Sequence, residues 1–302
     1  MGKLLIKRKH GLRKLYESGI KGMLGLCALI AVFTLILVFL FLLGNALPFF
    51  GEVDVWQFLT GTKWGPFNTV PAWGVLPLLV GTLMVSFVGA LIAIPIGIGC
   101  TIYISEIASP TVKRYLKPAI EILAGIPSVV YGLFAALVLS NWIYDIFDPV
   151  SRLNALNGAI ILAVMMIPIQ VSISEEAMNS VPRTIKEASL ALGANRWETI
   201  RRVVLPSALP GIIAAIALAI GRAVGETMAV IMATGNASQF TLDILASVKT
   251  MTAALAISVP EAPVGSIQYQ GLFAVGLLLF LITFAINFLA DYILQRYREA
   301  YQ

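Results

Sequence analysis

Six long stretches of this 302-residue chain contain almost no charged side chains. Each is close to or longer than the roughly 20 apolar residues that a helix needs to cross a bilayer. Only 12% of the residues are charged, whereas ordinary soluble domains carry about 25%. The sequence therefore predicts an all-α, polytopic membrane protein with six spans, at residues 23–47, 73–105, 122–144, 153–174, 207–235 and 271–290.

The positive charges predict how these spans are oriented, because lysine and arginine concentrate on the cytoplasmic side of a membrane. If the spans alternate in direction, 17 of the 21 lysines and arginines fall on one side. Only Lys63, Arg152 and Lys249 fall on the other, and Arg222 lies within the fifth span. We therefore expect both termini, and the long segment between spans four and five, to be cytoplasmic. The net charge of +5 is then a signal of topology and does not indicate a nucleic-acid partner.

Several classes of function find no support in the sequence. The first apolar run is longer than the 7–15 residues of a signal-peptide core, so we expect it to remain as a span. Cys27 and Cys100 both lie within spans and predict neither a disulfide framework nor a metal site. His10 lies alone in the basic amino-terminal tail. The chain has no G-x-x-x-x-G-K-[S/T] segment to cradle a nucleotide, so any ATP hydrolysis that drives it by this device must come from a partner.

Residues 187–206 form a polar, patterned segment between the fourth and fifth spans. Just upstream, Pro182 suits the first turn of a helix, and Gly193 is placed to end that helix in a left-handed conformation. Asn195, with Glu198 three residues later, has the spacing of a capping box for a second helix. We therefore expect two short helices joined by a tight turn at Gly193. Such a helical hairpin either docks a partner or merely joins two spans.

The segment resembles the EAA loop of ABC importer permeases, which meets the ATP-hydrolysing subunit. The resemblance is carried by Glu187 and Ala188, by Gly193 six residues after the glutamate, and by Leu205-Pro206 at the end. It implies that the EAA-like segment, about 176–206, docks a partner ATPase through these five residues.

The fifth span carries two charges, Arg222 and Glu226, which share one face if the helix is continuous. Even on a lenient scale an arginine near the bilayer centre costs about 2.5–3.5 kcal/mol, so it should face a cavity or a partner. One interpretation is an internal ion pair that pins this span to its neighbours. The other is an anion site, because a guanidinium matches phosphate oxygens with paired N–H donors. The sequence leaves both open.

The third span contains Pro127 within an otherwise helical pattern, which predicts a kink and an unpaired backbone carbonyl. Ser128 and Tyr131 follow directly. Their hydroxyls either satisfy that carbonyl or face a translocation path, and we include Ser128 with Arg222 and Glu226 as a candidate for the path.

Three further blocks, 123–132, 221–230 and 261–266, are similar to the C-type permease subunit of the bacterial phosphate ABC importer. The resemblance covers nearly the whole chain from the first span onward. Together with the charge pattern, it divides the chain into a six-span domain at 22–295, a basic tail at 1–21 that lies outside the resemblance, and a carboxyl tail at 296–302. It also implies residence in the inner cell membrane, and a substrate path without catalytic residues, metal or cofactor. The implied partners are an A-type permease subunit, two copies of an ATPase subunit and an external phosphate-binding protein, which would dock on the long outward segments 48–72 and 236–270.

Two other functions remain open at this stage. An ABC importer permease for another oxyanion or small solute would share the EAA-like segment without needing the charges of the fifth span. A secondary transporter would use charges within the membrane but would need no segment for docking an ATPase. A sensor role alongside transport is a further possibility.

Overall fold

The computed structural model describes the backbone of residues 2–299 and the side chains of residues 19–292. Within this part of the chain, six helices are long and apolar enough to cross a membrane, so the predicted all-α class and the number of spans are confirmed. The predicted tail at 1–21 continues the first span as one helix, and the charged side chains of both tails, apart from Lys21, lie outside the described side chains. The six spans are Gly19–Glu52, Leu76–Ile107, Ser128–Phe147, Ala155–Asn179, Arg196–Gly225 and Ile267–Tyr292.

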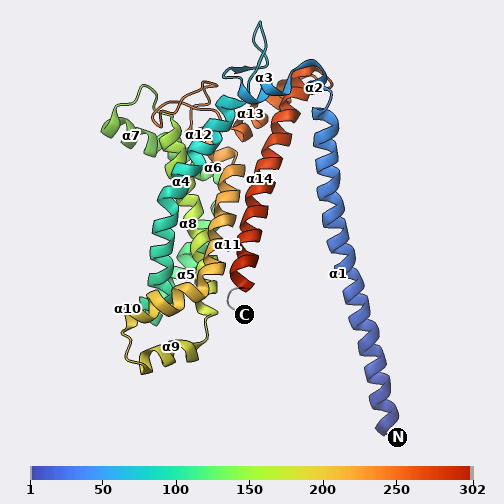
Figure 1. Ribbon diagram of the computed structural model, residues 1–302, viewed down its shortest axis with the longest axis vertical. Helices are drawn as coiled ribbons and strands as arrows, with labels where there is room; N and C mark the ends of the chain where they lie inside the picture. The colour runs from blue at the N-terminus through green and yellow to red at the C-terminus, as the bar shows by residue number, and fades with distance from the viewer. Residues whose placement is uncertain (1, 300–302) are drawn as a thin grey trace.

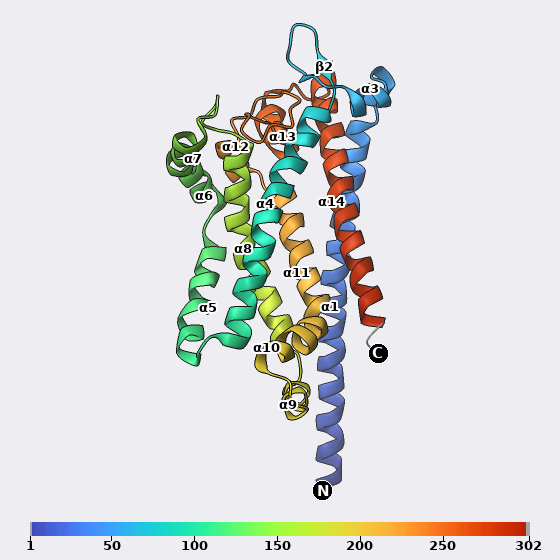
Figure 2. The ribbon, with the colours of Figure 1, turned by 60° about the vertical axis from the view of Figure 1, so that its left-hand side comes forward.

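The helices form a bundle with a small cap at one end (Figures 1 and 2). A two-stranded antiparallel ribbon in the cap pairs Trp64 with Trp73, and the cap also contains α2, α3 and α13. The elements, in chain order, are α1 (Gly2–Ala46), α2 (Phe49–Glu52), α3 (Val55–Thr60), β1 (Trp64–Gly65), β2 (Ala72–Trp73), α4 (Leu76–Ile102), α5 (Pro110–Gly125), α6 (Ser128–Phe134), α7 (Ser140–Phe147), α8 (Ala155–Asn179), α9 (Arg183–Ala191), α10 (Arg196–Thr199), α11 (Leu205–Gly225), α12 (Met228–Ala233), α13 (Met251–Ser258) and α14 (Ile267–Glu299).

Helices α4 and α8 pack closely because glycine allows the two backbones to approach. A Cβ atom on Gly89 would lie 3.0 Å from the carbonyl oxygen of Ala159. On Gly97 it would lie 2.6 Å from Cδ of Gln170, a side chain that is fully buried. These two helices, with α6, α11 and α12, surround the main apolar core.

Helix α1 packs along α14 rather than in the centre of the bundle (Figures 1 and 2). The contact includes Phe39 with Phe280, whose ring centroids are 5.5 Å apart, and Phe41 with Phe273, at 5.4 Å. The capped end has its own aromatic core, in which Phe49 lies edge-on to neighbouring rings. The opposite end of the bundle holds α9, α10 and both chain ends (Figures 1 and 2).

Three π-helical turns interrupt the spans, at Tyr103–Ile107, Ala135–Leu139 and Ile200–Val204. Such turns carry one extra residue and are frequent at functional positions. The first extends α4 to the end of the second span, and the third joins α10 to α11. The fifth helix is therefore continuous from Arg196 to Gly225.

Candidate functional site

The fifth span ends earlier than the sequence predicted. Helix α11 stops at Gly225, and Glu226 has an extended backbone, with φ −67° and ψ 133°. Helix α12 then begins at Met228. The expectation that Arg222 and Glu226 share a face of one continuous helix is therefore wrong. Thr227, a residue type that favours helix starts, was the available signal for a new helix here.

The break is stabilised by hydrogen bonds in which Glu226 is the central residue. Its Oε1 atom accepts from the backbone N–H groups of Thr227, at 3.1 Å, and of Ala229, at 3.3 Å. Its own carbonyl oxygen accepts from the hydroxyl of Thr252 at 2.8 Å. The carboxylate thus satisfies donors at the start of α12, which a helix start leaves without partners.

Arg222 lies in the last turn of α11, where the helix dipole favours a cation. Its side chain is exposed on the surface of this chain. The two ion pairs among the described side chains join Lys117 to Glu175 and Lys186 to Glu106, so the Arg222–Glu226 ion pair, one of the two interpretations left open by the sequence, is not formed there. Both residues nevertheless line one small cavity beside α8. The structure therefore brings them together but leaves the guanidinium free.

Ser128 begins α6 after a complete break in the third span. Helix α5 ends at Gly125 and Pro127 is extended, with φ −58° and ψ 140°, so the predicted kink is a break between two helices. Ser128 is half-buried and lies one turn before Gly132, on the same face of α6. A Cβ atom on Gly132 would lie 3.1 Å from Cα of Ala229. Ser128 thus faces the side of α6 that packs against α12.

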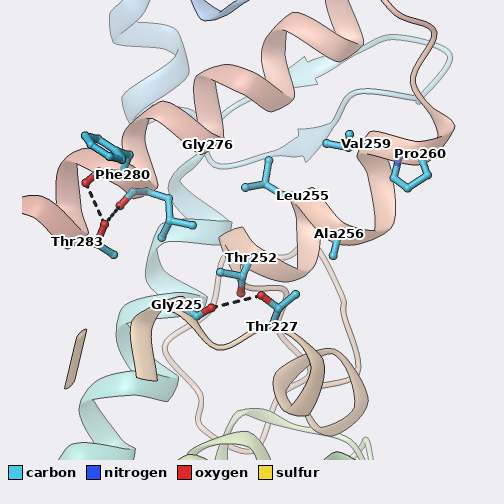
Figure 3. A pocket seen from close by; sticks show the side chains of 11 residues that line it. Gly225, Thr227, Thr252, Leu255, Ala256, Val259, Pro260, Gly276, Phe280 and Thr283 are labelled. Atoms are coloured by element: carbon cyan, nitrogen blue, oxygen red, sulfur yellow. Dashed lines mark hydrogen bonds between the residues drawn. The ribbon is translucent and has the colours of Figure 1, made fainter. Parts of the chain in front are cut away.

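An open groove of about 680 Å³ lies next to the break, between α11, α13 and α14 (Figure 3). Its lining is mostly apolar and contains no charged side chain. The three threonine hydroxyls in the lining, of Thr227, Thr252 and Thr283, donate to backbone carbonyls. These three hydroxyl groups are therefore already used as hydrogen-bond donors within the protein, and the groove offers few free donors to an anion. The nearest charged side chains to this groove on the fifth span, Arg222 and Glu226, line the separate small cavity beside α8.

The EAA-like segment has most of its predicted local structure. Gly193 has φ +89°, the left-handed conformation that ends a helix. The capping box is complete, because Asn195 Oδ1 accepts from Glu198 N and Glu198 Oε2 accepts from Asn195 N, both at 2.9 Å. The second helix is not a separate short element, because Leu205 and Pro206 continue it into the fifth span. Pro206 lies inside this continuous helix, shortly after the π-helical turn Ile200–Val204.

Helix α9 of this segment projects away from the bundle (Figure 1). None of its residues is buried, and Glu187, Ala188 and Gly193 are all exposed. Large apolar side chains are exposed beside them, with Leu192 at 90% and Trp197 at 56%. An amphipathic helix that buries nothing within its own chain is typical of a surface that packs against a partner.

The sequence analysis missed Glu106, which holds this segment to the end of α4. Its carboxylate accepts from Lys186 Nζ at 2.6 Å, and its carbonyl oxygen accepts from Arg196 Nη2 at 2.7 Å. Glu106 is the single acidic residue between positions 55 and 120, and it directly follows an apolar span on the cation-rich side. A lone carboxylate among cations at the end of a span could have indicated from the sequence that Glu106 binds one of them.

Comparison with known proteins identifies relatives along most of the chain. Residues 93–299 match the family described as binding-protein-dependent transport system inner membrane component. The chain is 36% identical, over 89% of its length and 88% of the relative's, to the probable ABC transporter permease protein YqgH of Bacillus subtilis. It is also 36% identical to the phosphate transport system permease protein PstC of Mesorhizobium japonicum, over 83% of this chain and 81% of that protein.

Solved structures share the fold at lower identity. A bacterial alginate ABC transporter, in complex with an alginate-bound periplasmic protein, matches with a TM-score of 0.62 at 16% identity, covering 89% of this chain and 93% of the other. The inward-facing MetNI methionine ABC transporter matches with a TM-score of 0.56 at 21% identity, over 74% and 94% of the two chains.

Proposed function

The chain belongs to the family of binding-protein-dependent transport system inner membrane components, and from this premise we propose that it is a permease subunit of an ATP-driven phosphate importer. Several relatives named as phosphate transport permeases are 30–36% identical to it over most of its length. The proposal assigns to the chain one half of a translocation path, with no bond chemistry of its own.

The observation that carries the substrate assignment is the free guanidinium of Arg222. It lies within a membrane-spanning helix, is exposed on this chain, and is not paired with a carboxylate among the described residues. An arginine facing lipid at this depth is costly, so it should face a partner or an aqueous path. Paired N–H donors suit the oxygens of a tetrahedral oxyanion. Glu226 lines the same small cavity as Arg222, and we propose it as a path residue that accepts a hydrogen bond from a protonated oxyanion. Ser128, at the start of α6, is proposed as a further residue of the path.

The surface that contains Arg222 needs a second subunit to enclose a path. We propose an A-type permease subunit as that partner, with two copies of an ATPase subunit and an external phosphate-binding protein completing the importer. The EAA-like segment would dock the ATPase through Glu187, Ala188 and Gly193, next to the exposed Leu192 and Trp197. Leu205 and Pro206 would anchor its return into the fifth span.

This assembly places the EAA-like segment and both chain ends on the cytoplasmic side of the inner membrane. The distribution of lysine and arginine supports that orientation, as does the position of α9 and both chain ends at one end of the bundle (Figure 2). The long segments at the opposite end would then receive the external binding protein.

The function is tested by uptake of ³²P-phosphate into proteoliposomes that contain the complete complex. We expect uptake that requires ATP, and that Arg222→Ala abolishes while subunit assembly is kept. Arg222→Lys should retain part of the uptake, because it keeps the charge but loses the paired donors. Loss of assembly in both variants would favour a structural arginine. Uptake without ATP would indicate a secondary transporter, and competition by sulfate as strong as by phosphate would indicate another oxyanion.

A further inference from the structure

Ser105 and Glu106, at the end of the second span, are contacted by side chains from four other parts of the chain. They lie in the π-helical turn that extends α4. Lys113 of α5, Asn179 of α8, Lys186 of α9 and Arg196 of α10 all make hydrogen bonds to one or the other. We call Ser105–Glu106 the hub.

Helix-end physics explains why cations gather at this hub. The last carbonyl groups of a helix have no partner within the helix, and the helix dipole places partial negative charge there. Lys113 Nζ donates to the carbonyl oxygen of Ser105 at 2.6 Å, and Arg196 Nη2 donates to that of Glu106 at 2.7 Å. The hub therefore satisfies the end of α4 with side chains from α5 and α10.

The Glu106 carboxylate adds an ion pair with Lys186 at 2.6 Å. Their side chains are only 14% and 22% exposed, so water screens this pair less than a surface pair. Lys186 lies on α9, one residue before Glu187 of the EAA-like segment. The pair thus joins the proposed ATPase-docking helix directly to the second span.

A second branch extends from the hub to α8 and α5. The hydroxyl of Ser105 donates to Asn179 Oδ1 at 3.2 Å, and Asn179 Nδ2 donates to Glu175 Oε1 at 2.7 Å. Glu175, which is 4% exposed, completes the branch with Lys117 at 2.8 Å. The ends of α4, α5 and α8 are therefore linked through one continuous polar network.

Helix α9 depends on these contacts because it has no buried side chain of its own. Its described side-chain hydrogen bonds to other elements are Lys186 with Glu106, and Ser189 with Thr199 at 3.0 Å. The second of these stays within the EAA-like segment. The Lys186–Glu106 pair is therefore the hydrogen bond that joins α9 itself to the second span, while Arg196 joins α10 of the same segment to it.

From this geometry we infer that Glu106 is a positioning residue that transmits movement of the ATPase-docking segment to the second span, with Lys186 as its partner. The inference rests on the proposed function, since it requires an ATPase that moves α9. Because α4 packs tightly on α8 at Gly97 and Gln170, a force applied at Glu106 would move both helices. Without the pair, α9 would still move with the ATPase, but the second span would move less.

The test uses the complete complex in proteoliposomes, with three readouts: retention of the ATPase on purification, the rate of ATP hydrolysis, and ³²P-phosphate uptake. The variants are Glu106→Gln, Lys186→Met, the double variant, and Lys186→Arg. Glu106→Gln keeps the backbone carbonyl that binds Arg196. The matched controls are Asp145→Asn on α7 and Arg183→Met on α9, both exposed residues outside the network.

We expect Glu106→Gln and Lys186→Met to retain the ATPase and to hydrolyse ATP, while phosphate uptake per ATP falls by roughly fivefold or more. The double variant should be no worse than either single variant, because both remove the same interaction. Lys186→Arg should keep most of the uptake per ATP, since it keeps the charge and the donor.

Two results would overturn the inference. One is uptake per ATP in both single variants equal to that of the control variants. The other is release of the ATPase from both single variants, which would make the pair part of the docking surface rather than a transmitting contact. Failure of the proposed function is distinguishable, because the unaltered complex would then show no ATP-dependent phosphate uptake at all.

Discussion

The hydroxyl of Tyr131 donates a hydrogen bond to the carbonyl oxygen of Leu123 at 2.8 Å, replacing the bond that Pro127 cannot make. In a continuous helix that carbonyl would accept from the backbone N–H four residues later, and the residue there is Pro127. The backbone N–H of Ile126 also approaches it, at 3.3 Å. The predicted unpaired carbonyl is thus satisfied from across the break.

Tyr131→Phe should therefore destabilise the protein by about 0.5–1.5 kcal/mol, the net contribution of a typical hydrogen bond, because the carbonyl keeps its contact with the N–H of Ile126. Tyr131 is only 8% exposed, so water cannot readily take the place of its hydroxyl. The thermal unfolding midpoint of the purified complex measures the effect. Tyr115→Phe, at a side chain 72% exposed, is the control and should change little; equal midpoints in the two variants would refute the role of Tyr131.

The capping role of Glu226 predicts that its shape matters more than its charge for stability. Glu226→Gln keeps a side-chain oxygen for the N–H groups of Thr227 and Ala229, whereas Glu226→Ala leaves both without an acceptor. We expect the alanine variant to lose about 1–3 kcal/mol and the glutamine variant less than half of that. Thermal unfolding again provides the measurement. Equal losses in the two variants would indicate that an ion pair to Arg222, and not the cap, is the important interaction.

The left-handed backbone of Gly193 predicts a cost for any side chain at this position. Nothing lies within 4 Å of a Cβ atom built there, so the strain of Gly193→Ala comes only from its φ of +89° and should be about 1–2 kcal/mol. The amount of ATPase that co-purifies with the variant should fall as well, since the turn at Gly193 sets the direction of α9.

Gly99→Ala is the matched control for Gly193→Ala, because a Cβ atom on Gly99 also meets nothing within 4 Å but lies inside helix α4. There alanine should leave the unfolding midpoint unchanged or raise it, since alanine favours a helix interior by about 0.5–1 kcal/mol over glycine. Loss of stability in both variants would show that backbone conformation is not the cause.

Lys249 lies half-buried in the segment between α12 and α13, outside the spans. Burial lowers its pKa from the ordinary value, and the nearby negative charge of Glu261 partly opposes this shift. A group whose folded pKa is lowered destabilises the protein while it is charged in both states. That penalty is fully present below the folded pKa and fades as the pH rises from there to the unfolded value.

Lys249→Met should therefore raise the thermal unfolding midpoint at pH 7, and the gain should shrink as the pH approaches 10.5, the unshifted pKa of the lysine. Measuring both proteins between pH 7 and 10.5 checks the trend. A gain that grows with pH would contradict the sign of the shift, and Lys63→Met, at an exposed lysine of the same end, serves as the control.

Features with a local physical cause were predicted well. The number of spans follows from the length of the apolar runs, and the turn at Gly193 and the Asn195–Glu198 capping box follow from residues three or fewer positions apart. The helix continuity around Pro206 and the break after Gly225 were predicted wrongly. In both cases a single proline or glycine is compatible with more than one backbone path, and contacts from elsewhere select among them.

At the candidate site, the sequence identified Arg222 and Glu226, but its expectation that they share one face of a continuous helix was wrong. The i and i+4 spacing implies a pair only while the helix lasts, and Thr252, 26 residues beyond Glu226, helps to hold the chain in its extended conformation. The assignment of Ser128 to a path stays a prediction. So does ATPase docking by Glu187, Ala188, Leu205 and Pro206.

The sequence by itself determined that this chain is a six-span helical membrane protein with a capped, glycine-hinged segment between spans four and five, because hydropathy and capping act over short stretches of chain. Only the tertiary structure decided which charges meet. Lys186 binds Glu106 across 80 positions, and Arg196 reaches the same residue across 90. These contacts depend on which helix ends the fold brings together. Glu226 likewise caps the next helix and forms no ion pair with Arg222 among the described side chains.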